Sequence, residues 1–156
     1  IGAYFSDIEN AKNFMAGTNF EHFYQEINVT DIFLQESHNC VVTLYGKCQY
    51  EEAFAACCFM LRLFPSLPEF WFAHGNILWQ QGKIENALVS YEIAHSLDDM
   101  SPLYPLYMAY CYLHTKEPSQ ASEALEKAEK LLATDDEYNI KEEVIAIKKE
   151  IIRGGE

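Results

Sequence analysis

The chain has 156 residues and carries 24 acidic against 11 basic side chains, which gives a formal net charge of -13. This length is typical of one domain, and contents of 49% hydrophobic and 14% aromatic residues exclude a disordered chain. The negative charge repels phosphate groups and anionic lipid. It therefore disfavours nucleic-acid and membrane-surface partners, and it suits basic or apolar polypeptides.

The sequence also predicts where the protein resides. It contains no apolar run of about 18 residues, so no membrane-spanning helix is expected. Residues 1–20 lack the basic and apolar regions of a secretion signal. The five cysteines are odd in number and fit no paired disulfide framework. We therefore expect a cytoplasmic protein with reduced thiols.

The N-terminal part, residues 1–33, is expected to be helical. Thr30 stands directly before an apolar periodic run and is predicted to cap a helix. Together with the apolar spacing, this indicates one or two helices ahead of the main body of the chain. The large apolar residues that mark them are Phe14, Phe20, Phe23, Ile27 and Ile32.

The strongest pattern in the sequence is an internal repeat of 34 residues. Ala53, Ala87 and Ala121 are each one repeat apart, and several apolar positions keep the same step. This pattern resembles the tetratricopeptide repeat (TPR), in which a small side chain lets two antiparallel helices approach closely where they cross. The resemblance implies three helical hairpins, in repeats at residues 34–67, 68–101 and 102–135.

Local signals place the helices within each hairpin. Pro65 ends an apolar periodic stretch, and Gly82 fits a tight turn between two helices. Ser101 is predicted as an N-cap with Pro102 at the first helical position, and residues 116–118 are predicted to form the turn equivalent to that at Gly82. The expected helix pairs are 34–47 with 51–64, 68–81 with 85–98, and 102–115 with 119–132.

Residues 136–153 are predicted to form a capping helix. Ile140, Val144, Ile147 and Ile151 lie on one stripe, and the opposite face carries lysines and glutamates. A stack of repeats needs such a last element with a polar outer face. Residues 1–156 are thus predicted to form one all-α TPR domain, a short right-handed superhelix with a helical segment at each end.

In a TPR stack the first helix of each pair lines the concave surface. Here most of the lining positions carry apolar or aromatic side chains, whereas a solvated face would carry Lys, Glu and Gln. Aromatic side chains dominate many protein interfaces because they bury a large area at low entropic cost. The predicted groove residues are Gln35, His38, Val42, Tyr45, Glu69, Phe72, Asn76, Trp79, Leu103, Leu106, Tyr110 and Leu113.

Two interpretations of these residues stay open at this point. In the first, the groove is exposed and binds an extended or helical peptide from another protein. In the second, N-terminal or C-terminal helices of the same chain fold over the groove and bury its residues as ordinary core. The second interpretation applies most to Leu103 and Leu106, which begin the last repeat.

Other functions find little support in the sequence. TPR domains that clamp the carboxylate of heat-shock chaperones need cations that this groove lacks, and only Asn76 matches their pattern. Cys40 and Cys48 lie near His38, but no C-x-x-C pair is present, and free cysteines usually pack as small apolar residues. No nucleophile elbow, phosphate-binding glycine loop or H-E-x-x-H motif appears. We therefore expect no enzyme activity, metal site or cofactor.

A closer resemblance covers nearly the whole chain. The N-terminal segment FMAGTNFEHFYQEINVTD is followed by LYGKCQYEEAFAACCFMLRLFP and PEFWFAHGNILWQQGKIENALVSYEIA, then by a third repeat and a terminal helix. In this order, and with this length and acidity, the chain resembles the class II chaperones of bacterial type III secretion. Those cytosolic chaperones are the partners of the hydrophobic translocator proteins.

The resemblance implies a function and a binding site. Such chaperones hold an extended apolar segment of the translocator in the concave groove, which keeps the client soluble and secretion-competent. Family groove positions correspond here to Tyr45, Tyr50, Phe72 and Trp79, whereas His38 stands where the family has a tyrosine. Members often form homodimers through the N-terminal segment. The alternatives are a generic TPR scaffold or adaptor and a chaperone of needle subunits.

Overall fold

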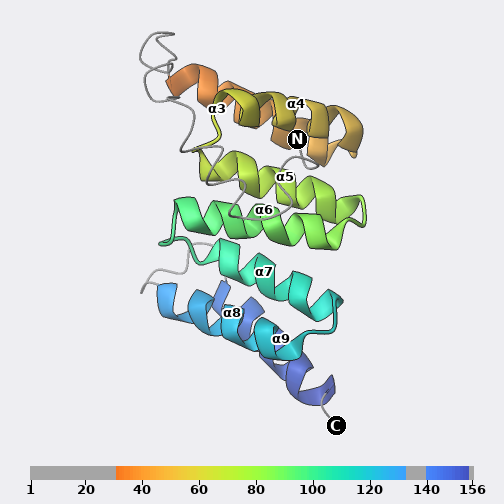
Figure 1. The fold of residues 1–156 in the computed structure, drawn as a ribbon, viewed down its shortest axis with the longest axis vertical. Coiled ribbons are helices and arrows are strands. Elements are labelled where there is room, and N and C mark those ends of the chain that lie inside the picture. The colour runs from red at the N-terminus through yellow and green to blue at the C-terminus, as the bar shows by residue number, and fades with distance from the viewer. Residues whose placement is uncertain (1–30, 133–139, 155–156) are drawn as a thin grey trace. The chain divides into compact units, whose positions relative to one another are not determined.

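The computed structural model describes residues 31–132 and 140–154 (Figure 1). These residues form helices and turns without any strand, so the all-α prediction is confirmed. The chain divides into two compact units, one that ends at Leu97 and one that begins at Asp98. The single TPR domain and its superhelix stay predictions. The predicted N-terminal helices lie outside the described residues.

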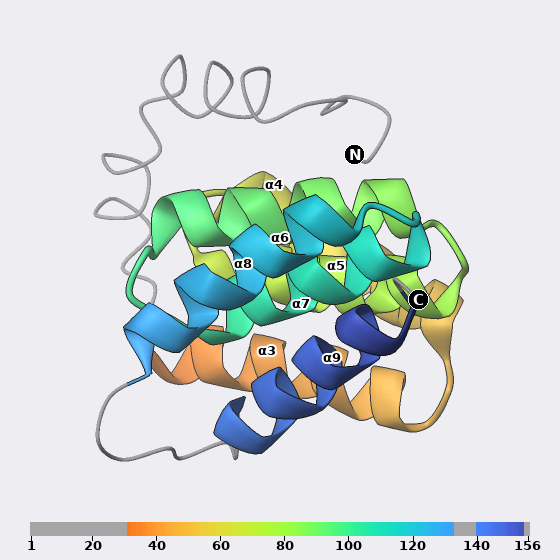
Figure 2. The same ribbon diagram turned by 90° about the horizontal axis from the view of Figure 1, so that it is seen from below.

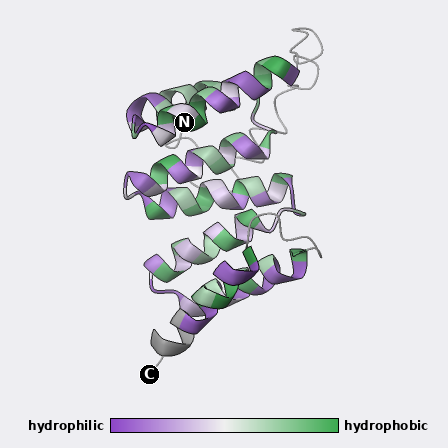
Figure 3. Cartoon of the chain, turned by 180° about the vertical axis from the view of Figure 1, so that it is seen from behind, coloured by the Kyte–Doolittle hydropathy of each residue, from purple (hydrophilic) through white to green (hydrophobic). Residues whose placement is uncertain are grey.

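The first unit contains four described helices. Apart from α3, which begins three residues earlier than predicted, at Asp31, their bounds agree with the expected ones to within one residue. α3 packs against α4 and α5, α4 also contacts α5, and α5 packs along α6. Figure 3 shows apolar and polar residues mixed along these helices, as expected for amphipathic elements. The helices are α3 (Asp31–Gly46), α4 (Tyr50–Leu63), α5 (Pro68–Gln80) and α6 (Ile84–Leu97).

The second unit contains α7 (Leu103–His114), α8 (Pro118–Leu131) and α9 (Ile140–Gly154). α7 packs against α8, and α9 contacts both of them (Figure 2). Because α7 begins at Leu103, Pro102 occupies the N-cap position and not the first helical position that the sequence predicted. Helix ends often shift by one residue in this way.

α9 buries an apolar stripe against the rest of the second unit. Ile140, Val144 and Ile147 are buried, and Lys148 Nζ forms an ion pair with Glu129 of α8 at 2.6 Å. The predicted amphipathic helix at the C-terminal end is therefore present. It begins at Ile140, and residues 133–139 lie outside the described part of the chain.

The 34-residue repeat is visible in the backbone of three turns. Cys48, Gly82 and Lys116 have φ angles of 59°, 74° and 63°, in the left-handed region. In each turn two backbone hydrogen bonds of 2.8 to 3.1 Å close back onto the preceding helix. This is the Schellman arrangement that ends many helices. The turn expected at Gly82 and its equivalent around Lys116 are therefore confirmed.

Small residues allow the paired helices to approach closely. Ala53, Ala87 and Ala121, the residues that mark the repeat, are fully buried. At the crossing of α5 and α6, a Cβ atom on Gly75 would overlap the ring of Tyr91. Glycine is therefore the residue that this contact requires, and the first unit is built around the α5–α6 pair.

Candidate peptide-binding site

Three of the predicted groove residues lie on one face of α3. His38, Val42 and Tyr45 are spaced by one helical turn, so their side chains are neighbours along the helix. Val42 is 50% exposed, and the other two are half-buried. The His38 ring meets Phe70 of α5 edge-on, with the ring centroids 5.9 Å apart. This face of α3 therefore borders α5 and leaves apolar surface open to solvent.

Tyr45 and Tyr50 form an aromatic pair at the turn between α3 and α4. Their rings pack edge to face with centroids 5.6 Å apart. The side-chain amide of Gln80, at the end of α5, donates a hydrogen bond to the Tyr45 hydroxyl at 3.0 Å. A hydrogen bond with the Cys48 side chain raises the pKa of Tyr50, so its hydroxyl stays neutral. Residues of three helices thus fix both rings in place.

Phe72 and Asn76 of α5 are positioned by one buried residue of α6, Tyr91. The Phe72 and Tyr91 ring centroids are 5.7 Å apart, and the Tyr91 hydroxyl donates a hydrogen bond to Asn76 Oδ1 at 2.9 Å. Among the described residues, Asn76 Nδ2 donates to no acceptor. Trp79, almost one turn further along α5, is half-buried.

An aromatic core behind this surface holds α5 in place. Trp71 Nε1 donates a hydrogen bond to the Pro65 carbonyl at 2.6 Å. The His74 ring stacks on Phe54 with centroids 5.2 Å apart, and His74 Nδ1 lies 2.9 Å from Ser90 Oγ. Burial lowers the pKa of His74 to about 4, so the imidazole is neutral at pH 7. α5 is thereby fixed between α4 and α6.

The predicted groove residues of the second unit lie on α7 and are less accessible. Leu106 is fully buried, whereas Leu103, Tyr110 and Leu113 are half-buried. The Tyr110 ring packs edge-on against Tyr107, with centroids 6.0 Å apart. Because nearly every residue of α7 is apolar or aromatic, most sides of the helix bury well. Leu106 is therefore a core residue here, and a partner reaches it only if its neighbours move.

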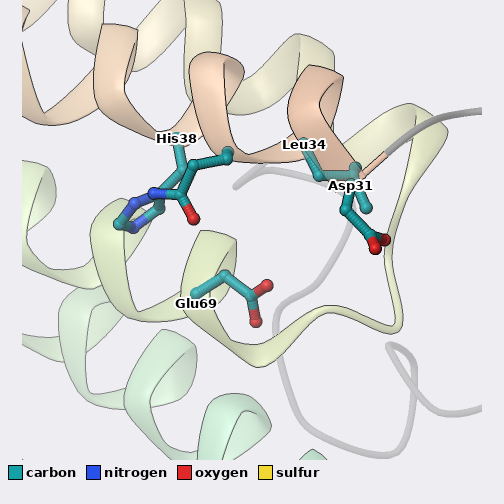
Figure 4. A pocket seen from close by; sticks show the side chains of 5 residues that line it. Asp31, Leu34, His38 and Glu69 are labelled. Atoms are coloured by element: carbon teal, nitrogen blue, oxygen red, sulfur yellow. The ribbon is translucent and has the colours of Figure 1, made fainter.

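A pocket of about 410 Å³ opens between α3 and α5 of the first unit (Figure 4). Three of its lining residues, Gln35, His38 and Glu69, are predicted groove positions. Asp31 and Leu34 complete the lining, and the sequence did not single them out as groove residues. The N-cap expected at Thr30 was the signal that could have placed Asp31 in the first turn of α3.

The described ranges contain neither a metal site nor a membrane-spanning helix. No group of three or more His, Cys, Asp or Glu residues within them is arranged to hold a metal ion, and none of their helices is long and apolar enough to cross a membrane. All five cysteines are free thiols. Cys57 is buried, its Sγ donates to the Phe70 carbonyl at 3.1 Å, and burial raises its pKa. This thiol is therefore a core group and not a reactive one.

Neither a protein-family model nor a curated protein matches this chain in sequence. Solved structures do match it in fold. The type III secretion chaperone SycD of Yersinia enterocolitica, in complex with a peptide of the translocator YopD, matches with a TM-score of 0.75 and 22% sequence identity. That match covers 81% of this chain and 98% of SycD.

Two further structures give the same result. PcrH of Pseudomonas aeruginosa, in complex with the chaperone binding region of PopD, matches with a TM-score of 0.74 and 17% identity, over 82% of this chain and 97% of PcrH. A chain of the CopN–Scc3 complex matches with a TM-score of 0.70 and 27% identity, over 80% of this chain and 74% of that one. The chain therefore has the fold of the type III secretion translocator chaperone SycD and of PcrH.

Proposed function

We propose that this protein is a chaperone of type III secretion translocators. It binds an extended apolar segment of a hydrophobic, pore-forming translocator and keeps that client soluble and secretion-competent in the bacterial cytoplasm. The observation that carries the proposal is the aromatic face of the first unit, which consists of Tyr45, Tyr50, Phe72 and Trp79. This face belongs to a fold that the chain shares with SycD and PcrH. Those two proteins were solved with a YopD peptide and with the chaperone binding region of PopD.

The binding surface of the first unit is made by α3, α5 and the start of α4. The Tyr45–Tyr50 pair, Val42 and Trp79 supply apolar area, and the Asn76 amide donates to a carbonyl of the bound segment. Neighbouring side chains already hold Tyr45 and Asn76 in place. Less side-chain entropy is then lost on binding, and more of the interaction energy appears as affinity.

In the second unit, Tyr110 and Leu113 are further contact residues, since both are half-buried and α7 is rich in apolar side chains. The net charge of -13 keeps the complex with an apolar client in solution. We expect no catalytic activity. A homodimer through residues 1–33 is also part of the proposal, and SycD has been solved as an alternative dimer.

Capture of the client from native cytosol tests this function. We expect the wild-type chain to retain a large protein with membrane-active apolar segments, identified by mass spectrometry. The Tyr45→Ala and Trp79→Ala variants should each weaken client binding by roughly 1–3 kcal/mol, and the double variant should lose the client. Phe59→Ala removes an aromatic ring that is 59% exposed on α4 and outside the proposed surface, so it should retain the client.

Three results would contradict the proposal. If the double variant retains the client while its circular dichroism is unchanged, the binding surface lies elsewhere. If all variants capture the same small soluble partner, the protein is a TPR adaptor. If the partner is a short helical subunit, the protein is a needle chaperone.

A further inference from the structure

The pocket between α3 and α5 differs in chemistry from the aromatic face beside it. Two carboxylates line the pocket, Asp31 from the first turn of α3 and Glu69 from the first turn of α5. Figure 4 shows both side chains bordering the same opening, with His38 further along it. Leu34 adds an apolar wall, and both carboxylates are exposed. The pocket is therefore acidic at its mouth and partly apolar along one side.

Neither carboxylate is neutralised by a basic side chain of the described residues. Two ion pairs among the described residues join Lys127 with Glu123 and Lys148 with Glu129, and neither involves Asp31 or Glu69. Acidic residues are favourable in the first turn of any helix because of the helix dipole. That effect explains each carboxylate singly. The packing of α3 against α5 additionally brings the two into one pocket, where their potentials add.

We infer that this pocket takes a lysine or arginine side chain of the bound translocator segment and thereby contributes to the choice of client. This inference rests on the proposed function. The aliphatic part of the basic side chain packs against Leu34, and its charged end lies near Asp31 and Glu69. Gln35 Nε2 donates to Asn39 Oδ1 at 3.2 Å, which leaves the Gln35 carbonyl oxygen as a further acceptor.

Two other occupants fit the pocket less well. An apolar side chain would displace water from the two carboxylates without offering either a partner, which costs free energy. A metal ion would need at least three suitably placed ligands, and the described residues hold no such group. A basic side chain neutralises both carboxylates and also suits a chain with a net charge of -13.

Peptide selection tests the inference. Random 12-residue peptides displayed on phage are selected on the immobilised full chain and on the Asp31→Asn/Glu69→Gln variant. We expect the wild type to select apolar peptides with a Lys or Arg at a constant distance from the apolar residues. The variant should select the same apolar pattern without the basic residue. Glu52→Gln/Glu85→Gln is the matched control, because it removes the same charge at two exposed residues outside the pocket.

A selected peptide then gives the size of the effect by fluorescence anisotropy. Replacing its basic residue by norleucine should weaken binding to the wild type and to the control about three- to tenfold, and should leave binding to the pocket variant nearly unchanged. The inference is overturned if peptides bind without any preference for a basic residue, or if the control loses that preference as well. The proposed function survives both results. If no apolar peptide is selected at all, the proposed function and the inference fall together.

Discussion

The two helices that carry most of the proposed surface, α3 and α5, differ in how they are held. α5 buries seven of its 13 residues, whereas α3 buries only Val41 of its 16. Three large apolar side chains of α3 stay open to solvent, Ile32 by 73%, Phe33 by 45% and Val42 by 50%. Apolar area that folding leaves open can still be buried on binding. α5 is therefore the scaffold of the first unit, and we propose that α3 is its contact element.

The largest difference in stability between the two helices is expected at Trp71 in α5. Its side chain is buried and donates a hydrogen bond to the Pro65 carbonyl, so Trp71→Ala should lower the free energy of unfolding by about 3–5 kcal/mol. Val42→Ala in α3 should lower it by less than about 0.5 kcal/mol. Urea unfolding followed by circular dichroism measures both values. Similar losses for the two variants would mean that α3 is as well packed as α5.

The pH dependence of stability tests the core behind α5. The pKa of His74 is about 4 in the folded protein, against an ordinary value of 6.5. Below pH 6.5 the unfolded chain binds a proton that the folded chain does not, so the free energy of unfolding falls as the pH drops towards 4. Above pH 6.5 no loss occurs. At about 1.4 kcal/mol per pH unit the expected loss is about 3 kcal/mol.

Substitution of His74 separates its contribution to the pH dependence of the free energy of unfolding from the contribution of the many carboxylates. His74→Gln keeps a polar side chain but cannot titrate, so its free energy of unfolding should change less between pH 6.5 and pH 4 than that of the wild type. Urea unfolding at a series of pH values gives both curves. Parallel curves for the two proteins would show that His74 is not buried in its neutral form.

The smallest effects are expected at two glycines, one in α5 and one in α3. Gly75→Ala places a Cβ atom against the Tyr91 ring and should destabilise the protein by about 1–3 kcal/mol. Gly46, the last residue of α3, has no atom within 4 Å of such a Cβ, so Gly46→Ala should be neutral or stabilising by up to about 1 kcal/mol. Thermal unfolding gives both shifts. If Gly46→Ala destabilises the protein as much as Gly75→Ala, the surroundings of Gly46 at the C-terminal end of α3 are not open.

The positions of the helices could be predicted because their signals are local. Pro65 ends one helix and Gly82 closes one turn, so each acts locally, and the structure agrees with the bounds that they predicted. The repeat register predicts a first helix from residue 34, whereas α3 begins at Asp31. The added turn places Asp31 in the lining of the pocket.

The details of the candidate site depend on packing and were not predictable in the same way. The Asp31 and Glu69 carboxylates line one pocket only because α3 packs beside α5. No sequence pattern indicates that the Tyr91 hydroxyl donates a hydrogen bond to Asn76. Groove positions counted along the repeat also placed Leu106 on the surface, whereas the structure buries it. The assignment of the groove residues as contacts stays a prediction.

Site-specific photo-crosslinking in the living bacterium shows whether the proposed surface contacts a translocator. A benzoyl-phenylalanine in place of Val42 samples the proposed surface, and one in place of Phe59 samples a slightly more exposed position outside it. We expect the probe at position 42 to crosslink to an apolar segment of a pore-forming secreted protein, mapped by mass spectrometry, and the probe at position 59 to give no such product. Crosslinking at position 59 but not at position 42 would contradict the proposed binding surface. Crosslinks from both positions only to proteins that never enter the secretion pathway would contradict the chaperone function itself.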